Sequence, residues 1–227
     1  MAIEKTIFTT SAGANRLAEL REWLVANATD YFDEITEVAS SAFLCKKNNK
    51  NVIKFKNGSQ SYSDGNMLYT ANNSFLIMRT AESFNANYVV KTSKGILIHF
   101  PSEYSTTSLA NTIFITKTQN YGLSIAFVGV TYGSTDYNEY RVYDFEHTPT
   151  FDYYVRASKD TSGLTSFKSQ MYKKEEMTVP QPIPCHGTAS YGVGLYQLYY
   201  SQFPLTEGEI TANGKNYYSN GYLALEE

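Results

Sequence analysis

From about residue 39 onward, hydrophobic side chains recur at every second position, and this period limits what the chain can fold into. Residues 51–58 (NVIKFKNG) show it plainly: Ile53 and Phe55 alternate with Lys54 and Lys56 before a glycine. Alternation with a period of two is typical of a β-strand with one buried face. No helical pattern separates the successive strands, which argues against a parallel α/β fold.

Two longer segments read as β-hairpins. Residues 87–100 turn at Lys94-Gly95, and residues 111–130 turn between 119 and 122. The second arm of the latter is apolar on both faces, which predicts a central strand. Residues 140–147 and 150–158 add two more strands. Short strands at this spacing favour a sandwich or barrel.

One helix precedes the strands. Leu17, Leu20 and Leu24 recur at helical spacing, so a helix is expected over 13–28, capped by Thr10 or Ser11 and packed through Trp23. The segment 29–38 fits either a second helical piece or a strand. The predicted fold is mainly β (α+β): an antiparallel β-sandwich or barrel-like domain with one N-terminal amphipathic helix. Residues 1–38 form the helical segment in this prediction, and residues 39–227 form the β-domain.

The last third of the chain contains two marked features. Residues 178–187 are rich in proline and poor in backbone donors, so an extended crossover between sheets or a linker is expected. A C-terminal hairpin is expected over 208–225. Asn213-Gly214 suits a two-residue turn with positive φ at both positions, which pairs 209–212 with 215–218. Asn220-Gly221 then redirects the chain into 222–225.

Charge and composition exclude several classes of protein. Lys and Arg number 19 against 22 Asp and Glu, for a net charge of −3, and the charges are interspersed, so no nucleic-acid partner is expected. No run of 18 apolar residues predicts a membrane span. The start of the chain lacks the apolar region of a signal peptide, which predicts synthesis and folding in the cytoplasm. Two cysteines fit a reducing compartment.

Chemistry-bearing residues form no convincing set. Cys185-His186, with His147 or His99 as base, is the sharpest nucleophile candidate, but adjacent side chains in an extended loop point apart. His99 is expected to be a half-buried strand residue. Three histidines and two cysteines lack metal-ligand spacing. We therefore expect no catalytic residue, no metal and no cofactor.

Tyrosine is the remaining compositional signal, with 20 in the chain. Several are consecutive in predicted strands, where neighbours face opposite sides, so one of each pair should lie outside. Exposed tyrosine is enriched in interfaces because it combines rigid area with a polar tip. The candidate contacts, for assembly or for glycan, are Tyr153, Tyr154, Tyr199, Tyr200, Tyr217, Tyr218 and Tyr222.

Residues 208–227 (GEITANGKNYYSNGYLALEE) carry a family resemblance. They resemble the closing segment of small virion structural proteins, especially tail-associated ones, of bacteriophages that infect Gram-positive gut bacteria. Ala212 departs from the β-branched residue expected before the turn. Residues 26–35 are similar more faintly.

The resemblance implies a non-enzymatic tail or baseplate protein of the virion, made in the host cytoplasm. It would assemble through β-surfaces with copies of itself and with other virion proteins. Two alternatives stay open. One is a carbohydrate-binding or host receptor-binding β-domain that contacts cell-wall polysaccharide. The other is a glycosidase that uses two of Asp144, Glu146 and Asp152.

Overall fold

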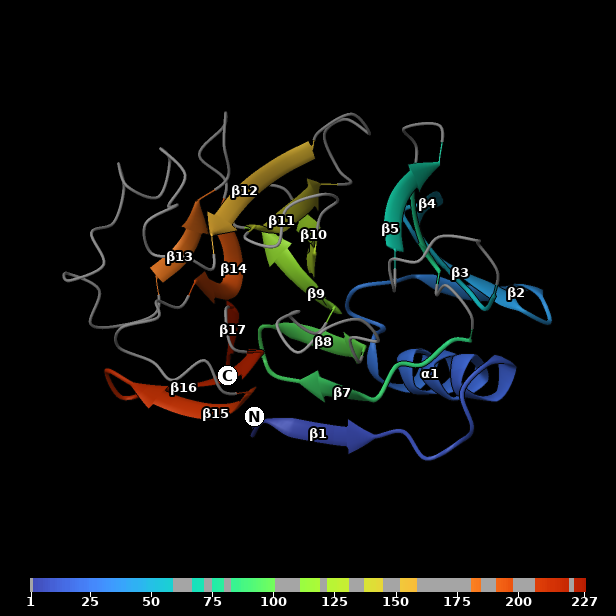
Figure 1. Ribbon diagram of the computed structural model, residues 1–227, viewed down its shortest axis with the longest axis horizontal. Helices are drawn as coiled ribbons and strands as arrows, with labels where there is room; N and C mark the ends of the chain where they lie inside the picture. The colour runs from blue at the N-terminus through green and yellow to red at the C-terminus, as the bar shows by residue number, and fades with distance from the viewer. Residues whose placement is uncertain are drawn as a thin grey trace.

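In a computed structural model, the described part of the chain is mainly β with one helix. The structure describes residues 2–58, 67–71, 75–79, 83–100, 111–118, 122–130, 137–144, 152–158, 181–184, 191–197, 207–220 and 223–227. Two sheets and the helix make up this part of the molecule (Figure 1). The predicted fold class is confirmed.

A five-stranded sheet has the order β2-β3-β4-β6-β5. Its strands are β2 (Glu34–Ala39), β3 (Ala42–Lys47), β4 (Lys50–Lys56), β5 (Met67–Ala71) and β6 (Phe75–Arg79). The open alternative for residues 29–38 is therefore resolved as a strand from Glu34, and the expected division at residue 38 falls inside β2. The β4–β6 pair is parallel, whereas we expected antiparallel pairing throughout.

A 12-stranded sheet contains the rest of the described strands. Its main path is β1-β7-β8-β9-β14-β17-β16-β15, with β10, β11, β12 and β13 off this path. The strands are β1 (Glu4–Ile7), β7 (Tyr88–Lys91), β8 (Gly95–Phe100), β9 (Asn111–Thr118), β10 (Gly122–Val130), β11 (Tyr137–Asp144), β12 (Asp152–Ser158), β13 (Gln181–Pro184), β14 (Tyr191–Gln197), β15 (Glu207–Ala212), β16 (Lys215–Asn220) and β17 (Leu223–Glu226).

The predicted hairpins are present in this sheet. β7 pairs with β8, and β9 pairs with β10, each antiparallel. β10 also pairs with β11, so its expected position between two strands is confirmed. Within the Pro-rich segment 178–187, β13 pairs with β14 alone among the described strands. An edge strand is where proline is tolerated, because its missing N–H is not needed by a second neighbour.

The helix α1 (Ala14–Asn27) matches the expected position closely, and Leu17, Leu20 and Leu24 are buried as predicted. The expected cap is wrong: Gly13 holds the N-cap position at φ 105, without a side-chain cap. Its amide donates to the carbonyl of Phe84 at 2.7 Å, which ties the helix start to the segment before β7.

Phenylalanine rings connect the two sheets in the core. Phe43 of β3 stacks on Phe55 of β4 with ring centroids 4.9 Å apart. Phe55 meets the edge of Phe84 at 6.4 Å, and Phe84 meets Phe100 of β8 at 5.4 Å. Leu17, Leu20 and Leu24 of α1 belong to the same buried cluster. The helix and both sheets therefore share one hydrophobic core.

The C-terminal hairpin forms in the predicted register. Ala212 lies opposite Lys215, and the two turn residues have positive φ, 49° at Asn213 and 72° at Gly214. β17 follows and pairs with both β16 and β14. The C-terminal strand β17 therefore lies between two other strands of the sheet and is not an edge strand.

Candidate functional site

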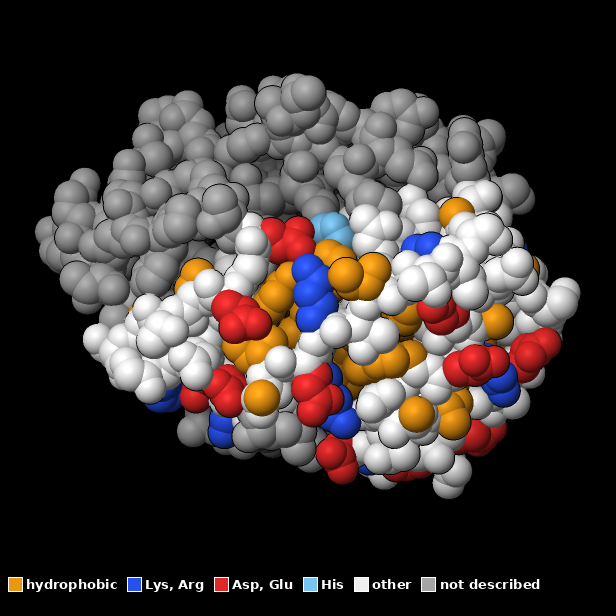
Figure 2. All heavy atoms as spheres, turned by 90° about the horizontal axis from the view of Figure 1, so that it is seen from below, with side chains coloured by type: hydrophobic (Ala, Val, Ile, Leu, Met, Phe, Trp, Pro, Cys, Tyr) orange, Lys and Arg blue, Asp and Glu red, His pale blue; other side chains and the backbone are white. Residues whose placement is uncertain are grey.

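The two ends of the 12-stranded sheet meet through side chains. β1 begins the main path and β15 ends it, yet residues from five strands near these ends contact one another. We call this set the junction cluster: Lys5, Tyr88, His99, Glu207 and Tyr218. Figure 2 shows basic, acidic, histidine and apolar side chains side by side on the face seen from below.

Glu207 is the centre of the junction cluster. Its Oε1 accepts hydrogen bonds from the hydroxyl of Tyr88 and, at 3.2 Å, from that of Tyr218. Lys5 Nζ lies 3.8 Å from the same oxygen and donates to Tyr218 Oη at 2.9 Å. Lys5 and Glu207 are each roughly a third exposed, so the ion pair lies at the surface. An exposed pair contributes at most about 1 kcal/mol, so the hydrogen bonds and the aromatic contacts matter beside it.

Aromatic contacts complete the junction cluster. The Tyr88 and His99 rings stack with centroids 4.5 Å apart and an interplanar angle of 12°. Tyr218 meets the edge of Tyr88 at 6.2 Å. Lys5 Nζ lies 3.9 Å from the centroid of the Tyr88 ring, within the range of a cation–π interaction. The lysine therefore contacts three strands at once.

His99 is buried and uncharged at neutral pH. Burial, and secondly the positive charge of Lys5, lower the pKa of His99 to about 4. Its Nε2 lies 4.0 Å from Glu207 Oε2. Because the imidazole is neutral, this contact is not an ion pair. Among the described residues, His99 Nδ1 is buried without a hydrogen-bond partner. The pKa of Tyr218 is raised, and burial is the main cause, so its phenol stays protonated at neutral pH.

The state of His99 predicts a pH dependence of stability. Unfolded histidine takes up a proton below about pH 6.5, whereas folded His99 stays neutral until about pH 4. The unfolded state therefore binds more protons in this window, and stability falls as the pH drops through it. The expected loss reaches about 3 kcal/mol. His99→Phe keeps a ring on Tyr88 but has no titratable group, so urea denaturation at stepped pH should show a smaller loss.

The groups that face His99 are Lys5, Tyr88 and Glu207. The lowered pKa values of Glu19, Asp33 and Glu34 cause losses at lower pH, equally in both proteins. A difference between wild type and His99→Phe that stays constant from pH 7 to pH 4.5 would contradict the assignment.

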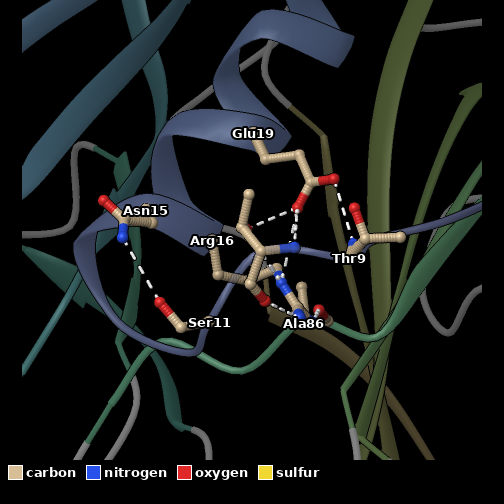
Figure 3. A network of polar contacts seen from close by, with 7 residues as sticks. Thr9, Ser11, Asn15, Arg16, Glu19 and Ala86 are labelled. Atoms are coloured by element: carbon tan, nitrogen blue, oxygen red, sulfur yellow. Dashed lines mark hydrogen bonds and ion pairs between the residues drawn. The ribbon is translucent and has the colours of Figure 1, made fainter.

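A second polar network holds the N-terminal segment on α1 (Figure 3). Glu19 accepts from Thr10 Oγ1 at 2.6 Å and from the amide of Thr9 at 3.1 Å. Arg16 donates to the carbonyl of Ala86 at 2.6 Å and also to that of Thr10. Burial alone would raise the pKa of Glu19, but these hydrogen bonds and Arg16 together lower it. The network fastens the chain just after β1, and it has a structural role.

The predicted tyrosine sites are only partly described. Tyr217 and Tyr218 are 4% and 3% exposed, so the expectation that one of the two lies outside is wrong here. Tyr217 packs with Ala224, while Tyr218 lies in the junction cluster. They do face opposite sides, but β16 is covered on both. Tyr153 and Tyr154 lie in β12, opposite Val142 and Arg141. The structure describes the backbone of these two residues and not their side chains. Tyr199, Tyr200 and Tyr222 are outside the described residues.

The catalytic candidates gain no support from the described residues. Cys45 is fully buried, and burial raises the pKa of its thiol. Cys185, His186, His147 and Glu146 are outside the described residues. Asp152 lies opposite Tyr143, which precedes Asp144 in the chain. Asp144 and Asp152 are therefore not directly opposite each other across β11 and β12. No group of three His, Cys, Asp or Glu suited to a metal occurs where side chains are described.

Sequence reasoning missed Lys5, Tyr88 and Glu207. Lys5 and Tyr218 are 213 positions apart, and Tyr88 and Glu207 are 119 apart. No local pattern relates them. His99 was expected to be half-buried, and it is in fact buried against Tyr88.

Comparison with known protein families, curated protein sequences and solved structures found no match to this chain. Within the described part, no helix is long and apolar enough to cross a membrane.

Proposed function

We propose that this chain is a non-enzymatic structural subunit of a bacteriophage virion, associated with the tail or baseplate, that assembles into a homo-oligomer through its β-surfaces. One observation carries the proposal. Of the three large hydrophobic residues that are exposed in the described part, Ile7 and Val38 lie on strands at the outer ends of the two sheets.

Those strands are suited to assembly. Ile7 in β1 is 66% exposed and Val38 in β2 is 47% exposed. A strand at a sheet edge presents unpaired N–H and C=O groups, which a strand of another chain pairs with readily. Monomeric proteins usually protect such edges, so exposed β-branched residues there favour a protein that works in contact with others.

The C-terminal hairpin supports the virion assignment through the resemblance of residues 208–227 to phage tail-associated proteins. The pairing of β15, β16 and β17 fits a subunit in which this segment is held in its own sheet. Synthesis in the host cytoplasm and location in the virion are parts of the same proposal. The partners are other copies of the chain and other virion proteins.

The carbohydrate-binding alternative required outward tyrosines. Tyr217 and Tyr218 are buried, so this pair has no face for stacking on a sugar. The glycosidase alternative required paired carboxylates, and Asp144 and Asp152 are not directly opposite each other in the β11–β12 pair. Neither alternative is favoured by a specific observation among the described residues.

Two measurements test the proposal. Light scattering on the purified protein should show an oligomer, or a monomer that assembles when other virion proteins are added. Mass spectrometry of purified phage particles should detect the chain at a stoichiometry above one copy. A monomer that no virion protein assembles, and that is absent from the particles, contradicts the proposal.

A further inference from the structure

We infer that β1 pairs antiparallel with β1 of a second copy of this chain, about a two-fold axis at Thr6, so that the 12-stranded sheets of two subunits become continuous. This inference rests on the proposed function, because it names the surface through which the subunit meets its own copy. Its basis is the exposure of β1, together with a charge pattern and a strand length that favour one register.

β1 is an edge strand with one neighbour. It pairs with β7 over Glu4–Lys91 to Ile7–Tyr88, and no other described strand pairs with it. All four of its residues are exposed. In Figure 1, β1 is the lowest strand, and Figure 2 views the molecule from that side, where described side chains lie across the middle of the face. The outer edge of β1 is therefore open to a partner in the described part.

The free backbone groups of β1 belong to Lys5 and Ile7. The amide of Phe8 donates to the carbonyl of Asn87 in the segment before β7. Every second residue of a strand directs its backbone groups to the same side, so Thr6 and Glu4 also direct theirs toward β7. In an antiparallel ladder the residues between them direct their N–H and C=O groups the other way. With the axis at Thr6, Lys5 of each copy lies opposite Ile7 of the other, and each such pair exchanges both hydrogen bonds.

Charge and strand length select this register. A two-fold axis between antiparallel strands is perpendicular to the sheet, so one residue must lie directly opposite its own copy. An axis at Glu4 or at Lys5 sets like charges directly opposite each other, which destabilises a sheet. An axis at Ile7 avoids like charges, but it sets Lys5 and Thr6 opposite residues beyond the end of β1. An axis at Thr6 sets threonine opposite threonine, a pair that stabilises a sheet. No like charges are then directly opposite within residues 4–7.

The exposed Ile7 is covered in this arrangement. Its side chain lies beside Lys5 of the second copy, on the same face of the joined sheet. The aliphatic part of a lysine side chain covers apolar surface while its ammonium stays in a polar setting. Glu4 of one copy lies opposite Phe8 of the other, whose ring is buried in its own core.

The junction cluster prepares Lys5 for this pairing. A lysine on an edge strand normally discourages pairing. Here Nζ lies 3.8 Å from Glu207 Oε1, so the charge is matched within its own chain. Tyr218 accepts a hydrogen bond from Lys5, and the Tyr88 ring lies under Nζ, so the side chain is already ordered. The two lysines of a dimer, which are diagonal neighbours about Thr6, are thereby held toward their own subunits.

The first test changes the charge opposite Lys5. Ile7→Lys places two lysines opposite each other twice per dimer, so the dissociation constant from analytical ultracentrifugation should rise at least about tenfold, or about 1.4 kcal/mol. Val25→Lys is the matched control, because it makes a comparable change at an exposed β-branched residue of α1, away from both edge strands. If Ile7→Lys weakens assembly no more than Val25→Lys does, β1 is not the contact.

A second variant at the same position separates charge from lost apolar area. Ile7→Glu removes the same side chain but places a carboxylate opposite Lys5, and opposite charges in such positions stabilise a sheet. Assembly of Ile7→Glu should therefore stay within about threefold of wild type at low salt. An equal weakening by lysine and by glutamate would show that Lys5 does not lie opposite residue 7.

The third test reads the register by cross-linking. Thr6→Cys and Glu4→Cys each alter one exposed residue, and both are made with Cys185→Ser, while Cys45 is buried. Thr6→Cys should form a disulfide-linked dimer under mild oxidation, because its two copies would have Cα atoms about 4.5 Å apart. Glu4→Cys should not, since its two copies lie about 14 Å apart at 3.4 Å per residue.

The outcomes separate the two proposals. Assembly that is weakened by Ile7→Lys and cross-linked through residue 6 supports the inference. Wild-type oligomers without that cross-link, or with a cross-link through residue 4 instead, overturn it and leave the proposed function standing. A wild-type chain that is monomeric at every concentration overturns the inference, and the proposed function also fails if that monomer is absent from phage particles.

Discussion

Replacing Phe84 by alanine is expected to lower the free energy of unfolding by about 3 to 5 kcal/mol. Phe84 is fully buried and its ring touches the edges or faces of Phe55 and Phe100. Because these rings belong to β4 and β8, the cavity would open between the two sheets. Urea denaturation followed by Trp23 fluorescence and by circular dichroism measures the loss.

The backbone of Phe84 stays in place in this variant. Its amide donates to Asn57 Oδ1 at 2.8 Å, and its carbonyl accepts from Gly13. Val25→Ala is the control, since Val25 is exposed on α1 and a surface change there shifts stability by less than about 0.5 kcal/mol. A loss below about 1 kcal/mol for Phe84→Ala would show that the ring does not join the sheets.

Replacing Gly95 by alanine is expected to cost about 2 to 3 kcal/mol through overpacking. A Cβ at this position would lie 2.7 Å from the carbonyl oxygen of Ile115 and 2.8 Å from Leu225 Cδ1. The first atom is backbone of β9 and cannot rotate away. Hydrogen exchange should show the amides of β17 exchanging faster, since Leu225 must move.

Gly214→Ala separates this steric effect from backbone strain. Gly214 has φ 72, and nothing lies within 4 Å of the added Cβ. Its cost is the left-handed conformation alone, about 1 to 2 kcal/mol, without faster exchange in β17. Equal exchange in the two variants would show that Gly95 is not a close contact between β8, β9 and β17.

Elements set by local pattern were predictable. Period-two alternation located β4, β7, β8, β9 and β10, and helical spacing located α1. The Asn213-Gly214 turn fixed the register of β15 and β16, because both residues must adopt positive φ and few others do so. In each case the deciding interactions join residues close in the chain.

Elements set by distant contacts were not predictable. β1 shows no strand alternation of its own and forms because β7 offers it an edge. The parallel β4–β6 pair joins strands that are not consecutive. The N-cap of α1 is Gly13 rather than Thr10 or Ser11, and its amide donates to the carbonyl of Phe84, a residue far along the chain.

The junction cluster follows the same division. Tyr218 was a candidate on its sequence, and its strand and turn were correctly placed. Its burial could not be inferred, because Tyr88 and Lys5, which cover it, come from strands much earlier in the chain. The period of side chains along a strand says which residues share a face, but it does not say what covers that face.

The amino-acid order therefore decided where the alternating strands, the helix and the C-terminal turn occur, because backbone preferences and side-chain periods act over a few residues. Tertiary structure decided which faces are covered, that the ends of the 12-stranded sheet meet at Glu207, and that His99 stays neutral there. Burial and charge at that place depend on residues as far apart as Lys5 and Tyr218, and only the folded chain brings them together.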